Sequence, residues 1–320
     1  MRKFVMLLTV LLAGVNACFA QSNYPDRSIT ILVGYAPGSS TDIVSRLIAD
    51  KMSRGLGQPV LVENVQGAAG LLAAQKLLRS AADGYTLVAF NPELAGIIPA
   101  LYKTPPYDSI KDFTHIGTMS INSGWIIAVN PRLPAKTFQE FVKLAKSTPK
   151  LLNYGTYGVG SVPHLEFEAL KAKLGIDMVH VPYKGGAVSY QAAVVGEVDV
   201  VAGSSFVELI KAGKLRALAI GGSKRSPQLP EIPTLVELGL GDEIFGEFYT
   251  ALSGPAGMPQ PILEKLSAEL KRILALPDIV ERIGRFSVAT YQTPEQFTER
   301  VRRNAAFYGP LVRSLGLSTN

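Results

Sequence analysis

The sequence of 320 residues contains one cysteine, three histidines and one tryptophan. A lone cysteine excludes a disulfide within the chain, and the histidines include no i,i+4 pair of the kind that binds zinc on a helix. Charged residues make up only 18% of the chain, and the net charge of +6 is spread along it. A basic cluster with interleaved aromatic residues is missing, which argues against nucleic acid. We therefore expect no metal, no cofactor and no nucleic-acid partner.

Signatures of catalysis and nucleotide binding are missing too. Gly203-Ser204-Ser205 is followed by Phe206, so no G-x-S-x-G nucleophile elbow occurs. The glycines at 155, 158 and 160 do not fit the dinucleotide-binding spacing G-x-G-x-x-G, and there is no G-x-x-x-x-G-K-[ST] phosphate loop. We predict a binding protein and not an enzyme. Turnover of a bound carboxylate would favour the enzyme alternative.

The N-terminus has the three regions of a secretory signal peptide. Arg2 and Lys3 precede an uncharged apolar segment over 4–15, and small residues follow before Gln21. The segment is shorter than the roughly 20 residues of a membrane span. We expect cleavage after Ala20 and a periplasmic protein, with 30 basic and 26 acidic residues and a net charge of +4. Lipid attachment at Cys18 is the alternative, because residues 15–18 loosely resemble a lipoprotein processing site.

Apolar, β-branched runs alternate with helical patterns through most of the mature chain, and the length suits about two domains. Such alternation predicts an α/β fold with mostly parallel sheets flanked by helices. The helix expected over 41–54 carries apolar residues at Ile43, Leu47 and Met52. The predicted division is signal peptide 1–20, lobe 1 from 21–122 plus 253–320, and lobe 2 from 123–252.

Two stretches share the order strand, turn, helix start. One is Gly34–Asp42, which follows the apolar run 29–33, and the other is Leu151–Ser161. The free N–H groups of a helix's first turn and the positive end of its dipole favour an anion. Hydroxyl residues at such a position also cap helices, and both roles are compatible. We expect the two loops to face each other and to hold one carboxylate-bearing molecule.

Motifs across nearly the whole mature chain resemble the substrate-binding component of the tripartite tricarboxylate transporter family, the Bug-type receptors. This resemblance implies a two-domain periplasmic binding protein, type II-like, with a cleft that closes on a ligand carboxylate held by two loops. The sequence departs from the family pattern at Ser39, where relatives usually have a second glycine, and at residues 64–67. The motifs that carry it are Ala36-Pro37-Gly38 with Asp42, Leu56-Gly57-Gln58-Pro59-Val60, Asp83-Gly84-Tyr85-Thr86-Leu87, Gly158–Ser161 with His164, His180-Val181-Pro182-Tyr183-Lys184-Gly185, Gly196-Glu197-Val198-Asp199 and Gly213-Lys214-Leu215-Arg216-Ala217.

The resemblance and the two loops together give the predicted ligand-binding residues. They are Tyr35, Ala36, Ser39, Ser40, Thr41, Asp42, Asn91, Thr156, Tyr157, Gly160, Ser161 and Ser204. Glu93 follows the third strand and either compensates a helix dipole or, if it faces the ligand, indicates an amino group or hydroxyl on that ligand. His164 is expected to be structural or to support the loop.

The predicted function is that of a periplasmic solute-binding protein. It would act as a monomer that captures a small organic acid and delivers it to the membrane permease subunits of a tripartite tricarboxylate-type transporter. The two lobes would hinge about the crossing segments near 122–124 and 247–250. A receptor that presents its ligand to a membrane sensor is the alternative, and the sequence leaves the identity of the acid open.

Overall fold

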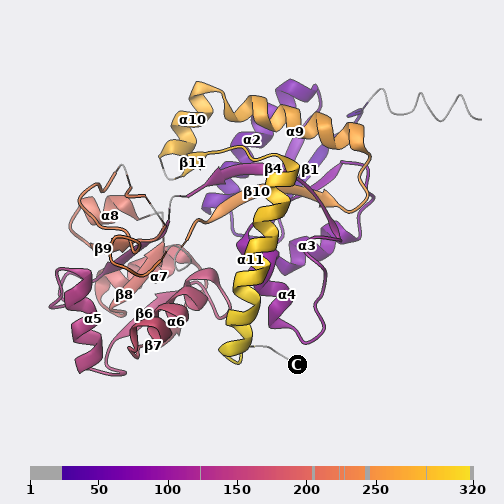
Figure 1. Cartoon of the computed structure of the whole chain (residues 1–320). Helices are drawn as coiled ribbons and strands as arrows, with labels where there is room; N and C mark the ends of the chain where they lie inside the picture. Colours follow the sequence, from indigo (N-terminus) through magenta and orange to yellow (C-terminus); the bar gives the residue numbers. More distant parts are fainter. Residues whose placement is uncertain are drawn as a thin grey trace, which may run out of the picture.

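Two lobes lie side by side, each a β-sheet flanked by helices (Figure 1), which confirms the predicted α/β class. The computed structural model describes residues 24–122, 124–203, 206–222, 224–226, 228–241, 246–285 and 287–317. The predicted signal peptide, Ser204 and Ser205 lie outside these ranges. Lobe 1 is the six-stranded sheet with its helices, and lobe 2 is the five-stranded sheet with its helices. Within the described ranges, no helix combines the length and the apolar character needed to cross a bilayer.

Lobe 1 has the strand order β11-β4-β10-β3-β1-β2. Its strands are β1 (Ile29–Val33), β2 (Val60–Asn64), β3 (Thr86–Phe90), β4 (Phe113–Ile121), β10 (Tyr249–Pro255) and β11 (Val288–Ala289). Its helices are α2 (Ser40–Leu56), η1 (Ala68–Gly70), α3 (Leu71–Leu78), η2 (Glu93–Ile97), α4 (Ile98–Leu101), α9 (Gln260–Leu274), α10 (Pro277–Gly284) and α11 (Pro294–Ser314).

Lobe 2 has the strand order β7-β6-β8-β5-β9. Its strands are β5 (Ile126–Val129), β6 (Asn153–Thr156), β7 (Val179–Pro182), β8 (Val200–Gly203) and β9 (Arg216–Ile220). Its helices are α5 (Phe138–Ser147), α6 (Val162–Leu174), α7 (Gly186–Val195) and α8 (Val207–Lys211).

In each sheet, the first strand after the chain crosses into the lobe runs opposite to the parallel strands. Strands β1, β2 and β3 are parallel, as are β6, β7 and β8. The first strand after each crossing, β5 or β10, pairs antiparallel with its neighbours. These two strands start at the connection between the lobes and run away from it, whereas β4 and β9 end there. The carboxyl ends of the parallel strands therefore point toward the other lobe, where ligands of open α/β sheets bind.

The apolar pattern of α2 differs from the prediction at one position. Leu47 and Met52 are buried as expected, together with Val44 and Ile48. Ile43 is 39% exposed. The buried stripe at positions 44, 47, 48 and 52 has the spacing of one helix face, and residue 43 is rotated away from its centre by about 100°.

The two crossing segments contact each other directly. The Asn122 N–H donates to the carbonyl of Phe248 at 2.7 Å, and the Gly221 N–H donates to the carbonyl of Trp125 at 2.8 Å. Gly124 has φ +132°, and a Cβ added there would lie 1.7 Å from the Gly221 carbonyl oxygen. Strand β10 pairs within lobe 1 from Tyr249 onward, so the predicted division at 252/253 falls inside this strand and the return crossing precedes it.

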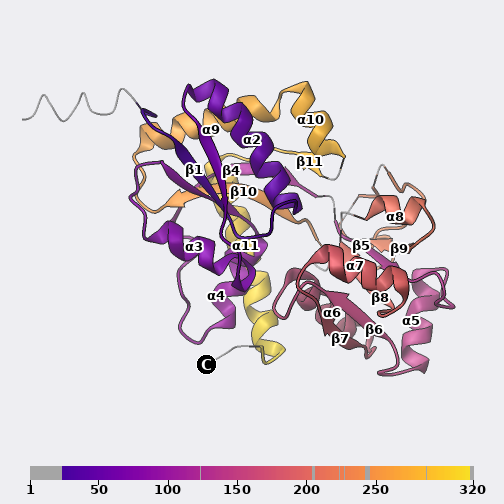
Figure 2. The same ribbon diagram turned by 180° about the vertical axis from the view of Figure 1, so that it is seen from behind.

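Helix α11 connects the cores of both lobes. Phe297 and Val301 in its first half pack in lobe 1, whereas Tyr308 and Val312 join the core of lobe 2. The Tyr308 hydroxyl donates to Oε1 of Glu166 on α6 at 2.9 Å. Both views show the end of α11 beside lobe 2 (Figure 1 and Figure 2). The lobes are thus joined by a packed helix as well as by the two crossing segments.

One buried histidine predicts acid sensitivity. His115 on β4 is 4% exposed and hydrogen-bonds to the Ser253 hydroxyl and the Ser109 carbonyl, both at 3.0 Å. Burial lowers its pKa from 6.5 to about 4, so the unfolded chain takes up the proton first. The stability that the neutral ring provides is therefore present above pH 6.5 and is lost as pH falls toward 4.

We expect wild-type protein to lose about 2–3 kcal/mol more stability between pH 7.5 and 4.5 than His115→Gln does. Urea unfolding of both proteins at the two pH values measures this difference. Parallel pH profiles would show that His115 does not contribute to the acid sensitivity.

Candidate functional site

The loop between β1 and α2 is shaped by a close backbone approach and a helix cap. A Cβ added to Gly34 would lie 2.5 Å from Cα of Gly70, so the two glycines let the chain segments touch. Ser39 has an extended backbone, and its hydroxyl accepts the Asp42 N–H at 3.2 Å. Ser39 is therefore the N-cap of α2. Its hydroxyl oxygen is occupied as an acceptor, so in the predicted ligand role the hydroxyl would act as a donor.

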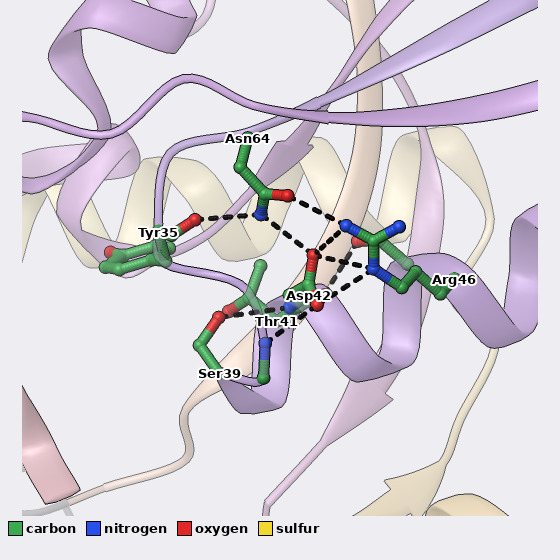
Figure 3. Close-up of polar contacts among 8 residues, drawn as sticks. Tyr35, Ser39, Thr41, Asp42, Arg46 and Asn64 are labelled. Atoms are coloured by element: carbon green, nitrogen blue, oxygen red, sulfur yellow. Dashed lines mark hydrogen bonds and ion pairs between the residues drawn. The ribbon is translucent and has the colours of Figure 1, made fainter.

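Asp42 holds this loop through a network of donors (Figure 3). Its carboxylate accepts the Gly38 N–H at 2.9 Å, Nε of Arg46 at 3.0 Å and Nδ2 of Asn64 at 2.8 Å. Nδ2 of Asn64 also donates to the Tyr35 carbonyl at 2.9 Å, which ties the end of β2 to the loop. Burial alone would raise the pKa of Asp42, but the hydrogen bonds from Arg46, Gly38 and Asn64 outweigh it and lower this pKa. Asp42 thus fixes the loop, and its carboxylate already accepts hydrogen bonds from Gly38, Arg46 and Asn64.

The start of α2 retains amide groups suited to an anion. The Asp42 N–H is used by the Ser39 hydroxyl, and the Ile43 N–H by the Ser39 carbonyl. Among the hydrogen bonds of the described residues, none uses the N–H of Ser40 or Thr41. Thr41 is buried and Ser40 is half-buried. These two amides lie at the positive end of a helix of 17 residues.

The second loop is held by its own hydroxyls and by two histidines. The Ser161 hydroxyl donates to the Gly158 carbonyl at 2.6 Å, and the Gly160 N–H donates to Nδ1 of His164 at 3.1 Å. Oγ1 of Thr156 lies 2.7 Å from Nε2 of His180, whose ring stacks on His164 at 4.0 Å between centroids. Ser161 has the extended backbone of an N-cap, but its side chain does not cap α6. The expected supporting role of His164 matches these contacts.

The two lobes meet around a buried carboxylate. Glu93 begins η2 and is 0% exposed. Its Oε1 accepts the hydroxyl of Tyr157, from the second loop, at 2.8 Å. Asn91 donates from Nδ2 to the Tyr35 hydroxyl at 2.6 Å and accepts the Leu94 N–H at Oδ1. Three predicted site residues, Tyr35, Asn91 and Tyr157, therefore gather beside a fourth residue that the predicted set did not contain.

Burial dominates the electrostatics of this cluster. It raises the pKa of Glu93, and the hydroxyl of Tyr157, the backbone N–H of Glu93, the hydroxyl of Tyr35 and the N–H of Val162 oppose that shift. Burial, followed by the charge of Glu93, also raises the pKa values of Tyr35 and Tyr157 well above 10. Both phenols keep their protons at neutral pH and remain hydrogen-bond donors.

In the described part of the chain, no group of three His, Cys, Asp or Glu side chains could hold a metal ion. His164 and His180 stack on each other, but Nδ1 of His164 accepts the Gly160 N–H and Nε2 of His180 contacts the Thr156 hydroxyl. The chemistry available at the lobe interface is hydrogen bonding by amides, hydroxyls and one carboxylate.

The structure brings some of the predicted residues together and leaves others apart. Tyr35, Asn91 and Tyr157 meet at the lobe interface, whereas Ser39, Thr156 and Ser161 shape their own loops. Ala36 is exposed, Gly160 packs against Leu101 of lobe 1, and Ser204 lies outside the described residues. Among the contacts of the described residues, none joins Ser39, Ser40 or Thr41 directly to the second loop.

Two supporting residues of the first loop were missed from the sequence. Arg46 stands four residues after Asp42, a spacing that brings opposite charges together on a helix and was a usable signal. Asn64 ends β2, which lies beside β1 in the sheet. Its role depends on that pairing, so the local sequence did not reveal it.

Several known proteins are similar to this chain in sequence. A family model described as "Tripartite tricarboxylate transporter family receptor" matches residues 44–317. A protein of Cupriavidus necator, described as "UPF0065 protein in gbd 5'region", is 35% identical over 314 residues, which cover 96% of this chain and 93% of that protein.

Two solved structures with bound ligands are similar over most of the chain. The structure described as "R. palustris Rpa4515 with adipate" has a TM-score of 0.83 and 27% identity, covering 92% of this chain and 98% of that chain. MatC from Rhodopseudomonas palustris with bound malate has a TM-score of 0.80 and 31% identity, covering 90% of this chain and 100% of that chain.

Proposed function

Since the chain belongs to the tripartite tricarboxylate transporter receptor family, we propose that it is a periplasmic receptor that binds a small carboxylate and delivers it to a membrane transporter. The adipate and malate bound to its structural neighbours are both small carboxylates. The observation that carries the proposal is the unused amide pair at the start of α2, at an edge where parallel strands end. Neutral donors suffice for such a ligand, because hydrogen bonds to a charged group contribute roughly 1.5–3 kcal/mol each.

In this proposal the ligand lies between the lobes and stabilises their closed arrangement. The start of α2 supplies Ser40 and Thr41, and the second loop supplies the residues from Thr156 to Ser161. Only a closed form brings both loops to one molecule, and this difference in affinity shifts the population toward closure. The segments that join β4 to β5 and β9 to β10 would act as hinges. Asp42, whose carboxylate already has protein donors, would position the loop without touching the ligand.

The finer parts of the proposal concern processing and partners. The first 20 residues would be removed as a signal peptide, and the mature protein would be a monomer that docks on the permease subunits of the transporter. A role in presenting the ligand to a membrane sensor is the alternative. Deleting the gene and measuring uptake of the ligand separately from the transcriptional response distinguishes the two roles.

A thermal-shift screen of organic acids against the mature protein tests the central claim. We expect at least one di- or tricarboxylate to raise the midpoint of unfolding, and calorimetry to give one ligand per chain. Recovering the ligand unchanged after incubation supports a receptor, whereas its conversion would indicate an enzyme. The absence of any stabilising carboxylate would contradict the proposal.

The double variant Thr41→Ala, Ser161→Ala tests the assignment of the two loops. We expect it to weaken carboxylate binding at least tenfold without unfolding the protein, because it removes a hydroxyl at each helix start. Calorimetry with the acid found in the screen measures the change. Thr137→Ala is a matched control, because it removes the N-cap hydroxyl of α5 in lobe 2. It should cost about 1 kcal/mol of stability and leave affinity unchanged. Unchanged affinity in the double variant would refute the assignment.

A further inference from the structure

One carboxylate oxygen of Glu93 accepts no hydrogen bond from the described residues, although the Tyr35 hydroxyl and the Val162 N–H act on the carboxyl strongly enough to oppose the rise of its pKa. Oε1 accepts the Tyr157 hydroxyl at 2.8 Å, but Oε2 is buried and has no hydrogen-bond partner among the described residues. A buried carboxylate normally has donors on both oxygens and a nearby cation, because desolvation strongly disfavours its charge. The Glu93 side chain therefore presents an unused acceptor at the lobe interface.

Among the described residues, no cation is one of the groups that act most strongly on the Glu93 carboxyl. The groups that act on its carboxyl most strongly are phenols and backbone N–H groups. The charge of Glu93 in turn affects the hydroxyls of Tyr107, Tyr249 and Tyr308 from lobe 1. These phenols are neutral, so they do not supply an opposite charge to the carboxylate.

A second buried polar group without a partner belongs to Trp125, which packs on the residue that donates to Glu93. The ring of Trp125 packs on Tyr157 at 6.1 Å between centroids, and its Nε1–H has no partner among the described residues. The start of α2 adds the amides of Ser40 and Thr41 on the lobe 1 side. The interface thus combines one unused anionic acceptor with several unused donors, the complement of a molecule that carries both a cation and a carboxylate.

We propose that Glu93 is a specificity residue that accepts the protonated amine of the ligand, so that the carboxylate taken by this receptor is an amino acid. This inference rests on the proposed function, since it names the class of carboxylate bound at the same site. The ammonium group would donate to Oε2 of Glu93, and its positive charge would keep the carboxyl ionised against the burial that raises the pKa of Glu93. A hydroxyl in place of the amine can donate but cannot neutralise the charge, so hydroxy acids should bind more weakly.

Matched ligands test the inference by isothermal calorimetry on the mature protein. Succinate, malate and aspartate share one carbon skeleton, and glutarate, 2-hydroxyglutarate and glutamate share a longer one. We expect the amino acid to bind best in at least one series, at least thirtyfold tighter than the unsubstituted diacid. Glu93→Gln preserves the shape and removes the charge, and we expect it to weaken amino acid binding at least hundredfold while changing diacid binding less than threefold.

Glu166→Gln is the control variant. Glu166 is also buried at the lobe interface and also accepts a tyrosine hydroxyl, that of Tyr308, at 2.9 Å. The Glu166→Gln variant should leave the preference for the amino acid over the diacid unchanged, even if the substitution alters lobe closure. Circular dichroism establishes that both variants are folded before binding is compared.

The outcomes separate this inference from the proposed function. A diacid that binds wild type as well as or better than the amino acid would overturn the role of Glu93 and leave the receptor function standing. An equal loss of amino acid and diacid binding in Glu93→Gln would also overturn it, because a merely structural role predicts no discrimination. Failure of every carboxylate to bind would instead refute the proposed function.

Discussion

Replacing Asp42 by alanine is expected to destabilise the protein by about 2–3 kcal/mol and to weaken carboxylate binding more than tenfold. The side chain is 3% exposed and anchors Gly38, Arg46 and Asn64. Its removal leaves these donors without an acceptor, although Arg46, at 49% exposed, regains water. The loop that presents the Ser40 and Thr41 amides would then lose its fixed geometry. Urea unfolding and calorimetry with the screened acid measure the two effects.

Asp50→Ala is the matched control on the same helix. Asp50 pairs with Arg54 at 3.1 Å, four residues on, but both side chains are largely exposed. Exposed pairs of this kind contribute only about 0.3–0.5 kcal/mol. We expect almost no change in stability or affinity for this variant. If Asp42→Ala proved as mild as Asp50→Ala, the network around the first loop would not hold it in place.

Gly124→Ala is expected to destabilise the protein by more than about 3 kcal/mol. The backbone at φ +132° disfavours any side chain, and the added Cβ would collide with the Gly221 carbonyl oxygen. Gly158→Ala separates these two causes, because Gly158 has φ +137° and nothing within 4 Å of an added Cβ. Strain alone should cost the control about 1–3 kcal/mol. Thermal and urea unfolding compare the variants, and equal losses would show that the contact between the crossing segments is dispensable.

The local structure was largely readable from the sequence, because it depends on contacts within a few residues. The apolar run at 29–33 is strand β1, and the helix expected over 41–54 is α2, which spans Ser40–Leu56. The hydroxyl residue Ser39, at the start of the expected helix, caps α2 through its side chain. β-Branched runs, turn glycines and capping hydroxyls act locally, so their signal survives in the sequence.

The candidate site depends on contacts that no local pattern encodes. Glu93 and Tyr157 are 64 positions apart and come from different lobes. At the sequence level Glu93 could equally have compensated a helix dipole. The structure shows its carboxyl buried against Tyr157. The antiparallel course of β5 and β10 was likewise invisible, because it follows from the path of the chain between lobes and not from the composition of either strand.

Helix α11, the last helix of the chain, would influence ligand affinity although it is part of neither loop. Because Tyr308 and Val312 are packed in lobe 2 while the first half of the helix rests on lobe 1, separating the lobes must either undo that packing or bend the helix near Gly309-Pro310. In the proposed closure of the lobes, the energy of that step would enter the open–closed equilibrium and hence the measured dissociation constant. Substitutions on the buried side of this last helix, remote from the ligand, would therefore change ligand affinity by shifting the balance between open and closed forms.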